Sequence, residues 1–255
     1  MINAKIKMIV TDLDDTLLRS DKTISDYTVS VFQRCRAMGI KIVFATARPI
    51  MMVEDIQERI PVDAVITMNG SCIFVGNQIW KAFTFEPSMQ RRILRDLTSR
   101  ETVYQISALT GDKYYSNRSE RAAYITYMDF EKETDVAFST IAFHYKDREK
   151  GLEILENYKN LSFVSVSSMD LFDILPENVN KFKGAEEVAT CFGIDVSEVV
   201  AFGDNFNDIE MLSGCGTGIA VENAISEAKA AANDICESCD QDGLAKWLER
   251  KILAH

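Results

Sequence analysis

The sequence has no long hydrophobic run and no excess of positive charge. No stretch of 18 consecutive apolar residues occurs, so we expect no membrane-spanning helix and no membrane partner. The formal net charge is -11 and the isoelectric point is about 4.8. This balance argues against binding of nucleic acid, whose phosphates require a basic surface. A small anionic substrate stays compatible with it, since a local site with a bound metal can oppose the overall charge.

The sequence is also poor in imidazole and in paired cysteines. Only His144 and His255 are present, and the six cysteines are scattered. Cys236 and Cys239 form a CxxC pair, but no second pair accompanies them, which disfavours a zinc or redox site. Cysteines in apolar contexts are typical of a reduced, cytoplasmic protein. Asp12 follows the N-terminal residues too early for a secretory signal, so we expect a cytoplasmic location.

The residues that are present suit an α/β fold with a sizeable core. Hydrophobic residues make up 47% of the 255 residues and charged residues 26%, as in globular proteins. Short apolar runs alternate with helical patterns at both ends of the chain. This alternation predicts a doubly wound (Rossmann-like) parallel sheet covered on both faces. The expected strands are 6–10, 40–45, 64–67, 199–202 and 217–221, and the expected helices are 28–38, 50–60, 183–192 and 208–212.

The middle of the chain, about residues 83–176, has a different pattern that is rich in tyrosine. Its expected strands are 104–108, 113–116, 139–144, 163–167 and 171–175, and its expected helices are 86–100 and 148–158. We interpret it as a second α/β unit inserted into the first. The predicted domains are therefore a core of 1–82 with 177–255 and an inserted unit of 83–176. One continuous large sheet is the alternative.

Acidic and hydroxyl side chains follow the expected strands at the point where each strand ends. Asp12 follows the first strand, Thr46 the second and Asp204 a late one. The carboxyl ends of parallel strands meet at one edge of a sheet, where ligands bind near a change in strand order. Asp14 and Asp15 crowd beside Asp12, which is unfavourable unless a positive charge joins them. The crowding predicts a cation, a phosphoryl-transfer site, or both.

The chemistry of these groups suits phosphoryl transfer. Carboxylate and carbonyl oxygens suit Mg²⁺, and an aspartate can act as a nucleophile that forms an aspartyl-phosphate. A lysine would neutralise phosphoryl charge, and the segment NKFKG offers Lys181 and Lys183, between which periodicity does not choose. Asp14 lies two residues from Asp12 and could exchange protons with the leaving group and then with water. Each signal is weak alone, and their order along the chain makes them specific.

Four segments together resemble the motifs of the haloacid dehalogenase superfamily. They are DLDDT at 12–16, ATAR at 45–48, the lysine of LPENVNKFKG, and GDNFNDIEML at 203–212. NG at 69–70, GIAVENA at 218–224 and DGLAKWLE near the end of the chain resemble the Cof-type sugar-phosphatase branch. The resemblance covers both ends of the chain, and the middle has the size of the α/β cap of that branch.

The resemblance implies a nucleophile, an acid/base and a metal site. Asp12 would be the nucleophile and Asp14 the general acid and base. Mg²⁺ would be held by Asp12, by the main-chain carbonyl of Asp14 and by Asp204. Asp208 would support the metal through water or through Lys181.

The same resemblance implies which groups hold the phosphoryl group. They are the Thr46 hydroxyl, the Ala47 amide, Lys181 and Asn207. Of the two lysines in NKFKG, the resemblance thus selects the first. The role of Arg48 stays open between a salt bridge within the core domain and a contact with substrate.

Together these expectations describe a Mg²⁺-dependent phosphatase that hydrolyses a small phosphorylated metabolite, such as a sugar phosphate, through an aspartyl-phosphate. A sugar phosphomutase of the same superfamily is the near alternative. A phospho-acceptor signalling domain or a non-enzymatic binding protein is the alternative of another class. We expect a monomer or a weak homodimer without a nucleic-acid partner. Five residues of the inserted unit could contact substrate or form a solvated face, namely Lys113, Tyr114, Tyr115, Arg118 and Arg121.

Overall fold

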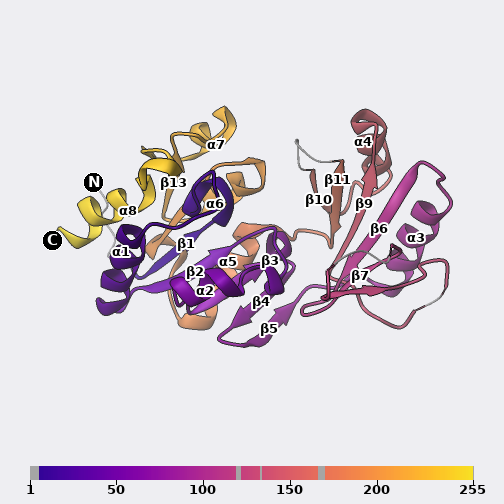
Figure 1. The fold of residues 1–255 in the computed structure, drawn as a ribbon, viewed down its shortest axis with the longest axis horizontal. Helices are drawn as coiled ribbons and strands as arrows, with labels where there is room; N and C mark the ends of the chain where they lie inside the picture. The colour runs from indigo at the N-terminus through magenta and orange to yellow at the C-terminus, as the bar shows by residue number, and fades with distance from the viewer. Residues whose placement is uncertain (1–5, 119–121, 133, 166–169, 255) are drawn as a thin grey trace. The chain divides into compact units, whose positions relative to one another are not determined.

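The chain divides into two compact units, one inserted into the other. The computed structural model describes residues 6–118, 122–132, 134–165 and 170–254. The first unit comprises Met1–Arg48, Met52–Trp80 and Asn180–His255, and the second comprises Lys81–Val179 with Pro49–Met51. Figure 1 shows each unit built around its own sheet. The predicted fold class, a parallel-sheet α/β core with a second α/β unit, is confirmed.

The first unit contains an eight-stranded sheet in the order β14-β13-β12-β1-β2-β3-β4-β5. Neighbouring strands from β14 to β3 are parallel, and β4 is antiparallel to β3. The strands are β1 (Met8–Thr11), β2 (Lys41–Ala45), β3 (Ala64–Thr67), β4 (Cys72–Val75), β5 (Gln78–Ala82), β12 (Val199–Gly203), β13 (Thr217–Val221) and β14 (Asp234–Cys236). The central strands are almost wholly buried, as expected for a parallel sheet with both faces covered.

Helices cover both faces of this sheet. They are α1 (Asp26–Ala37), α2 (Glu54–Arg59), α5 (Lys181–Phe192), α6 (Ile209–Gly214), α7 (Ser226–Ala231) and α8 (Gly243–Leu248). Trp247 of α8 packs edge-on against Phe202, with ring centroids 5.5 Å apart. Gly184 of α5 lies against Ile66. The register aligns Phe202 with Val65 through β1 and β2, so the neighbouring Ile66 points to the opposite face.

All six expected helices differ from the observed helices by one or more residues at an end. The helix expected at 50–60 is a 3₁₀ turn over Ile50–Met52 followed by α2. The helix expected from residue 183 begins at Lys181, because the Asn180 side chain caps it by accepting from the Lys183 amide at 2.8 Å. Such a cap satisfies an amide that has no partner within the helix. None of the described helices is long and apolar enough to cross a membrane.

The second unit contains a six-stranded sheet in the order β10-β11-β9-β6-β7-β8. Neighbouring strands of this sheet are antiparallel, except β7 and β8, which are parallel. The strands are β6 (Val103–Leu109), β7 (Tyr114–Ser116), β8 (Ile125–Tyr127), β9 (Thr140–Tyr145), β10 (Ser162–Ser165) and β11 (Leu171–Leu175). The strand expected at 163–167 corresponds to β10, and residues 166 and 167 lie outside the described residues.

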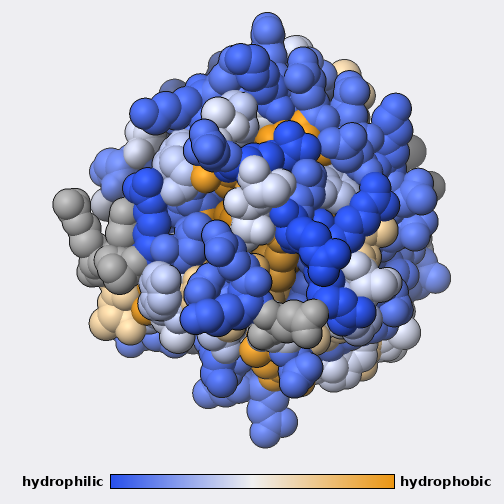
Figure 2. Space-filling model, turned by 90° about the vertical axis from the view of Figure 1, so that its right-hand side faces the viewer, coloured by the Kyte–Doolittle hydropathy of each residue, from blue (hydrophilic) through white to orange (hydrophobic). Residues whose placement is uncertain are grey.

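Two helices, α3 (Pro87–Thr98) and α4 (Arg148–Glu156), pack on one face of this second sheet. Ile93 and Ile154 from these helices share one apolar cluster with Phe143 and Phe172 from the strands. The outward side of α3 carries the exposed Arg91, Arg92 and Arg95. Figure 2 faces this unit and shows a largely hydrophilic surface with smaller apolar areas between the polar side chains.

Candidate active site

The site lies where the strand order of the first sheet reverses. From β1 the chain continues to β2 and β3 on one side, and later returns through β12 and β13 on the other. Asp12 follows β1 and Asp204 follows β12. The two strands are aligned so that Thr11 lies beside Phe202, and the Asp12 amide donates to the Phe202 carbonyl at 3.0 Å. The parallel register therefore delivers both carboxylates to the crevice where α/β folds bind ligands.

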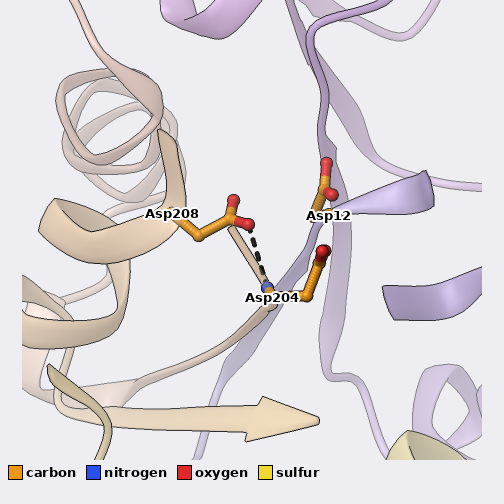
Figure 3. Close-up of side chains that lie close together, drawn as sticks. All are labelled: Asp12, Asp204 and Asp208. Atoms are coloured by element: carbon orange, nitrogen blue, oxygen red, sulfur yellow. Dashed lines mark hydrogen bonds between the residues drawn. The ribbon is translucent and has the colours of Figure 1, made fainter. Parts of the chain in front are cut away.

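Three carboxylates converge at this point, and Figure 3 shows them. Asp12, Asp204 and Asp208 are all buried, and each offers an oxygen within 4.8 Å of the others. Asp208 also closes its own turn, because its Oδ2 accepts from the main-chain amides of Asp204 and Asn205 at 3.0 Å. Gly203 makes room for this turn, since a Cβ there would lie 2.5 Å from the Cβ of Asp208. The glycine of the GD pair is thus required by packing.

Lys181 provides the positive charge that the cluster requires. Its side chain is 1% exposed, and its Nζ donates to Asp12 Oδ1 and to Asp208 Oδ1, each at 2.7 Å. Burial alone would lower the pKa of Lys181, but the charges of Asp12 and Asp208 outweigh it and hold the pKa above its ordinary value. Lys181 therefore stays protonated.

Lys183 faces away from this cluster. Its Nζ lies 3.5 Å from carboxylate oxygens of Glu186 and Glu187, and its side chain is 40% exposed. Because both lysines lie in the first turn of α5, residues two apart point in different directions. The structure thus distinguishes the two lysines that the sequence pattern left equivalent.

Gly70 allows the loop that carries Lys181 to approach. Its φ is +105°, and a Cβ on Gly70 would overlap the main-chain carbonyl of Asn180. Asn69 and Met68 also have positive φ values, 55° and 49°, which are unusual for residues with side chains. The NG pair of the sequence therefore serves to bring the end of β3 against the start of α5.

Burial and mutual repulsion raise the pKa values of two of the clustered carboxyls. For Asp12, burial raises the pKa well above its ordinary value, Lys181 opposes this, and Asp208 and Asp204 add to it. For Asp204, burial and the charge of Asp208 raise the pKa to about 6. The Thr16 hydroxyl donates to Asp204 Oδ1 at 2.6 Å and opposes that rise. Thr16 did not emerge from the sequence as a site residue, although it ends the DLDDT segment.

The Asp14 side chain makes a separate set of contacts. Arg48 binds it through two hydrogen bonds, from Nε to Oδ2 at 2.8 Å and from Nη2 to Oδ1 at 2.6 Å. Lys22 adds a contact of 3.2 Å to Oδ1. Burial would raise the pKa of Asp14, but the hydrogen bonds and charges of Arg48 and Lys22 lower it. Asp15 occupies the left-handed region with a φ of 58°, which a tight turn allows for aspartate.

The predicted phosphoryl-binding residues occupy the turns beside the acidic cluster. Thr46 is buried, and its Oγ1 accepts from the Arg48 amide at 3.1 Å. Ala47 is exposed. Asn207 donates from Nδ2 to Asn69 Oδ1 at 2.9 Å, and the Asn69 amide donates to the Thr46 carbonyl at 3.0 Å. Asn69 thus links the turns after β2 and β12, a role that the sequence did not indicate beyond the NG pair.

Two of the residues of the inserted unit named as possible substrate contacts, Tyr114 and Arg118, have partners within that unit. The Tyr114 hydroxyl donates to Ser107 Oγ at 3.2 Å. The Arg118 guanidinium lies over the Tyr104 ring, 5.4 Å from its centroid. Arg121 lies outside the described residues. These contacts leave the choice between substrate binding and a solvated face open.

The donor set of the acidic cluster fits a hard divalent cation. Its ligand atoms are carboxylate oxygens of Asp12, Asp204 and Asp208, the ligand type that Mg²⁺ prefers. A cation would also relieve the repulsion that raises the pKa values of Asp12 and Asp204. The residues present therefore fit a bound metal ion, and the ligand chemistry alone does not fix its identity.

Known proteins resemble this chain over nearly its whole length. The family model described as haloacid dehalogenase-like hydrolase matches residues 9–248. A 5-amino-6-(5-phospho-D-ribitylamino)uracil phosphatase of Bacillus subtilis, YitU, is 26% identical over 97% of this chain and 98% of its own. An HMP-PP phosphatase of Cronobacter sakazakii is 24% identical over 93% of this chain and 92% of its own.

Solved structures with the same fold are also found. One is described as the HAD subclass IIB sugar phosphatase BT4131, with a TM-score of 0.84, 24% identity, and coverage of 96% of this chain and 98% of its own. Another is described as a haloacid dehalogenase-like hydrolase from B. subtilis, with a TM-score of 0.84, 23% identity, and coverage of 97% and 100%. At these identities the structural likeness shows the fold.

Proposed function

Because the chain belongs to the haloacid dehalogenase-like hydrolase family, and is a phosphatase as its relatives are named, we propose that it is a Mg²⁺-dependent phosphatase acting on a small phosphorylated metabolite. The reaction would pass through an aspartyl-phosphate on Asp12. One observation supports this proposal above the others. Asp12 lies at the switch point of the sheet, in contact with the buried Lys181 and within 4.8 Å of two further carboxylates.

In the first half of the reaction, Asp12 attacks phosphorus and the ester bond to the leaving oxygen breaks. Asp14 donates a proton to that oxygen, so that an alcohol leaves rather than an alkoxide. Lys181 stabilises the charge on the phosphoryl oxygens from its buried position beside Asp12. The Thr46 hydroxyl, the Ala47 amide and Asn207 would hold the remaining oxygens.

In the second half, water attacks the phosphorus of the aspartyl-phosphate. Asp14 accepts the proton of that water, inorganic phosphate leaves, and Asp12 is regenerated as a carboxylate. The lowered pKa of Asp14 keeps it a carboxylate, the form that accepts this proton, and opposes the protonated form that the first half requires. Mg²⁺, when bound by Asp12, the Asp14 carbonyl and Asp204, with Asp208 in support, supplies positive charge against the phosphoryl oxygens.

We assign the choice of substrate to the inserted unit and propose a sugar phosphate or a similar phosphomonoester. The names of the relatives support this class, since one refers to a phosphorylated ribityl compound. A separate unit that selects the leaving group fits a fold family whose members act on varied substrates. Recruitment of water rather than a second sugar hydroxyl distinguishes this phosphatase from a phosphomutase.

A screen of phosphorylated metabolites tests the proposal directly. Phosphate release is measured with Mg²⁺, with EDTA, and after Mg²⁺ is restored, in the absence of any bisphosphate activator. We expect release only with the metal, and reversible loss with EDTA. Brief incubation and acid quenching should trap an acid-stable, hydroxylamine-sensitive phosphoryl group on the peptide that contains Asp12. Full activity in metal-free buffer, or phosphate on another residue, would refute the mechanism.

A further inference from the structure

We propose that Arg48 is a positioning residue that orients the Asp14 carboxylate for proton transfer and does not hold the phosphoryl group of the substrate. The inference rests on the proposed role of Asp14 as general acid and base. It concerns a residue whose role the sequence left open between a salt bridge and a substrate contact.

The first support is the geometry of the pair. Arg48 donates to both carboxylate oxygens of Asp14, from Nε to Oδ2 at 2.8 Å and from Nη2 to Oδ1 at 2.6 Å. Two parallel hydrogen bonds between a planar guanidinium and a carboxylate fix the plane of the carboxylate as well as its distance. The third guanidinium nitrogen, Nη1, donates to the Met52 carbonyl at 3.2 Å. All three nitrogens of Arg48 thus have a partner in the protein.

The second support is how firmly the backbone holds Arg48. Its amide donates to Thr46 Oγ1 at 3.1 Å, and its carbonyl accepts from the Met68 amide at 3.2 Å. The turn that places Thr46 in the site therefore also fixes the main-chain position of Arg48. A side chain anchored at its base and at its tip can transmit a fixed orientation to Asp14.

The third support is that Asp14 has few other constraints. Its side chain is 37% exposed, and the contact from Lys22 is longer, at 3.2 Å, from a side chain that is itself 47% exposed. Lys22 is also shared with Asp15, at 3.2 Å. Exposed lysine contacts are weak, so the bidentate Arg48 contact determines the direction of the carboxylate.

A positioning role predicts a loss that depends on the leaving group. The ratio kcat/KM reports the steps through cleavage of the ester bond. An alkyl phosphate needs a proton from Asp14 in that step, whereas a nitrophenyl phosphate has a leaving group that departs without one. We expect Arg48→Gln to lower kcat/KM for the alkyl ester by roughly 10–10²-fold, part of the 10²–10⁴-fold that an acid/base group supplies. The aryl ester should change less than about threefold.

The design includes a conservative variant, a double mutant and a matched control. Arg48→Lys keeps the charge but not the bidentate contact, so its loss on the alkyl ester should be intermediate. In an Asp14→Asn background, Arg48→Gln should have almost no further effect, because coupled residues are not additive. The control is Arg59→Gln, which breaks an exposed pair with Asp26 of 2.8 Å in the same unit and should leave both esters unaffected.

Three results would overturn the proposal. They are an equal loss on both esters, a loss that persists in the Asp14→Asn background, and weaker inhibition of Arg48→Gln by inorganic phosphate. Each would mean that Arg48 holds the phosphoryl group. If Arg48→Gln does not fold, as judged by circular dichroism, Arg48→Lys carries the same test. Wild-type protein that hydrolyses neither ester would instead refute the proposed function, which is a separate failure.

Discussion

The two units of this chain differ in whether they bury charged side chains. Among the described residues, the buried charged side chains are Asp12, Lys181, Asp204 and Asp208, and all lie in the first unit. The apolar cluster of the second unit is aliphatic and aromatic. In the second unit, the residue most comparable to the acidic cluster is Asp173. Its side chain is half-buried, and burial raises its pKa to about 7. Charge is thus concentrated where the chemistry is proposed, and the inserted unit relies on ordinary packing.

This difference shows that the acidic cluster is not a device for stability. Taking a charge out of water costs several kcal/mol, and a buried ion pair often does no better than apolar residues of the same size. In the second unit, the stacked rings of Phe143 and Phe172, 5.1 Å apart, stabilise the fold without such a penalty. Buried charge in the first unit therefore serves the proposed chemistry, whereas apolar packing in the second unit serves the stability of the fold. Mutations can separate these two effects.

The sharpest test of the comparison is Asp12→Asn. We expect turnover to fall by roughly 10⁴-fold or more, because an amide is a poor nucleophile and a poor metal ligand. The melting temperature should stay near that of wild type, since the substitution keeps the shape and removes a buried charge. Steady-state phosphate release and thermal unfolding measure the two effects. The control is Asp55→Asn, an exposed acid of the same unit. A variant that keeps more than a tenth of wild-type activity would remove Asp12 from its proposed role.

The next largest effect distinguishes Lys181 from Lys183. We expect Lys181→Ala to lose on the order of 10²–10³-fold in kcat, as loss of a charge-stabilising donor does, while Lys183→Ala stays within a few-fold. Lys181→Ala should also destabilise the fold by about 3–5 kcal/mol without metal, because it leaves buried carboxylates unpaired. Assays on one substrate and urea unfolding would measure both. The reverse ranking would show that the wrong lysine has been assigned.

A smaller effect should appear in the pH dependence of the metal requirement. The pKa of Asp204 is about 6 in the fold and about 3.9 in an unfolded chain. The metal-free fold therefore binds more protons between these values, and this group lowers the free energy of unfolding as pH rises from about 4 to 6. Because metal ligands must be deprotonated, the Mg²⁺ concentration for half-maximal activity should rise up to tenfold per pH unit below about 6.

Titration with Mg²⁺ at pH 5, 6, 7 and 8 checks this dependence. Asp204→Ala should need more Mg²⁺ at every pH, since it lacks a charged oxygen ligand, and should lose part of the pH dependence. A Mg²⁺ requirement that is constant from pH 5 to pH 8 would contradict the assignment of Asp204 to the metal.

The sequence predicts the central strands well and the edges of the sheet poorly. The strands expected at 64–67 and 217–221 agree to the residue with β3 and β13. The strands β4, β5 and β14 were not predicted. β14 has only three residues, Asp234–Cys236, too few for a periodicity to show. β4 is a short apolar run directly after the turn at Gly70, where the pattern reads as a loop.

Within the site, the sequence predicts which polar residues follow the strands, but it does not predict which side chains contact each other. The carboxylates of Asp12 and Asp204 follow from strand polarity alone. The hydrogen bond from Thr16 to Asp204 joins residues 188 apart, and the pair of Arg48 with Asp14 joins residues 34 apart. Such hydrogen-bond partners are determined by how distant segments of the chain pack together. A single sequence without a structure does not reveal that packing. The catalytic roles themselves stay predictions until the variants are measured.

The smallest expected effect on chemistry, and a direct test of the second unit, is Gly151→Ala. Gly151 lies inside α4, where alanine would favour the helix by about 1 kcal/mol. A Cβ there would overlap the ring of Phe172, which is stacked on Phe143 and has little room to move. Overpacking of this kind costs about 1–3 kcal/mol, so we expect a net loss in the free energy of unfolding. Phosphoenzyme formation from acetyl phosphate, a donor with a small leaving group, should stay within about threefold of wild type.

The matched control for that variant is Glu153→Ala, an exposed position of the same helix. Because surface changes are usually within about 0.5 kcal/mol, this variant should unfold at the same urea concentration as wild type. Unfolding of the two variants, followed by circular dichroism, gives the difference. If Gly151→Ala were as stable as Glu153→Ala, the Phe172 ring would have to move, and the second unit would not be as closely packed as the structure indicates. If Gly151→Ala instead lost phosphoenzyme formation while still folded, the separation of packing in one unit from chemistry in the other would be wrong.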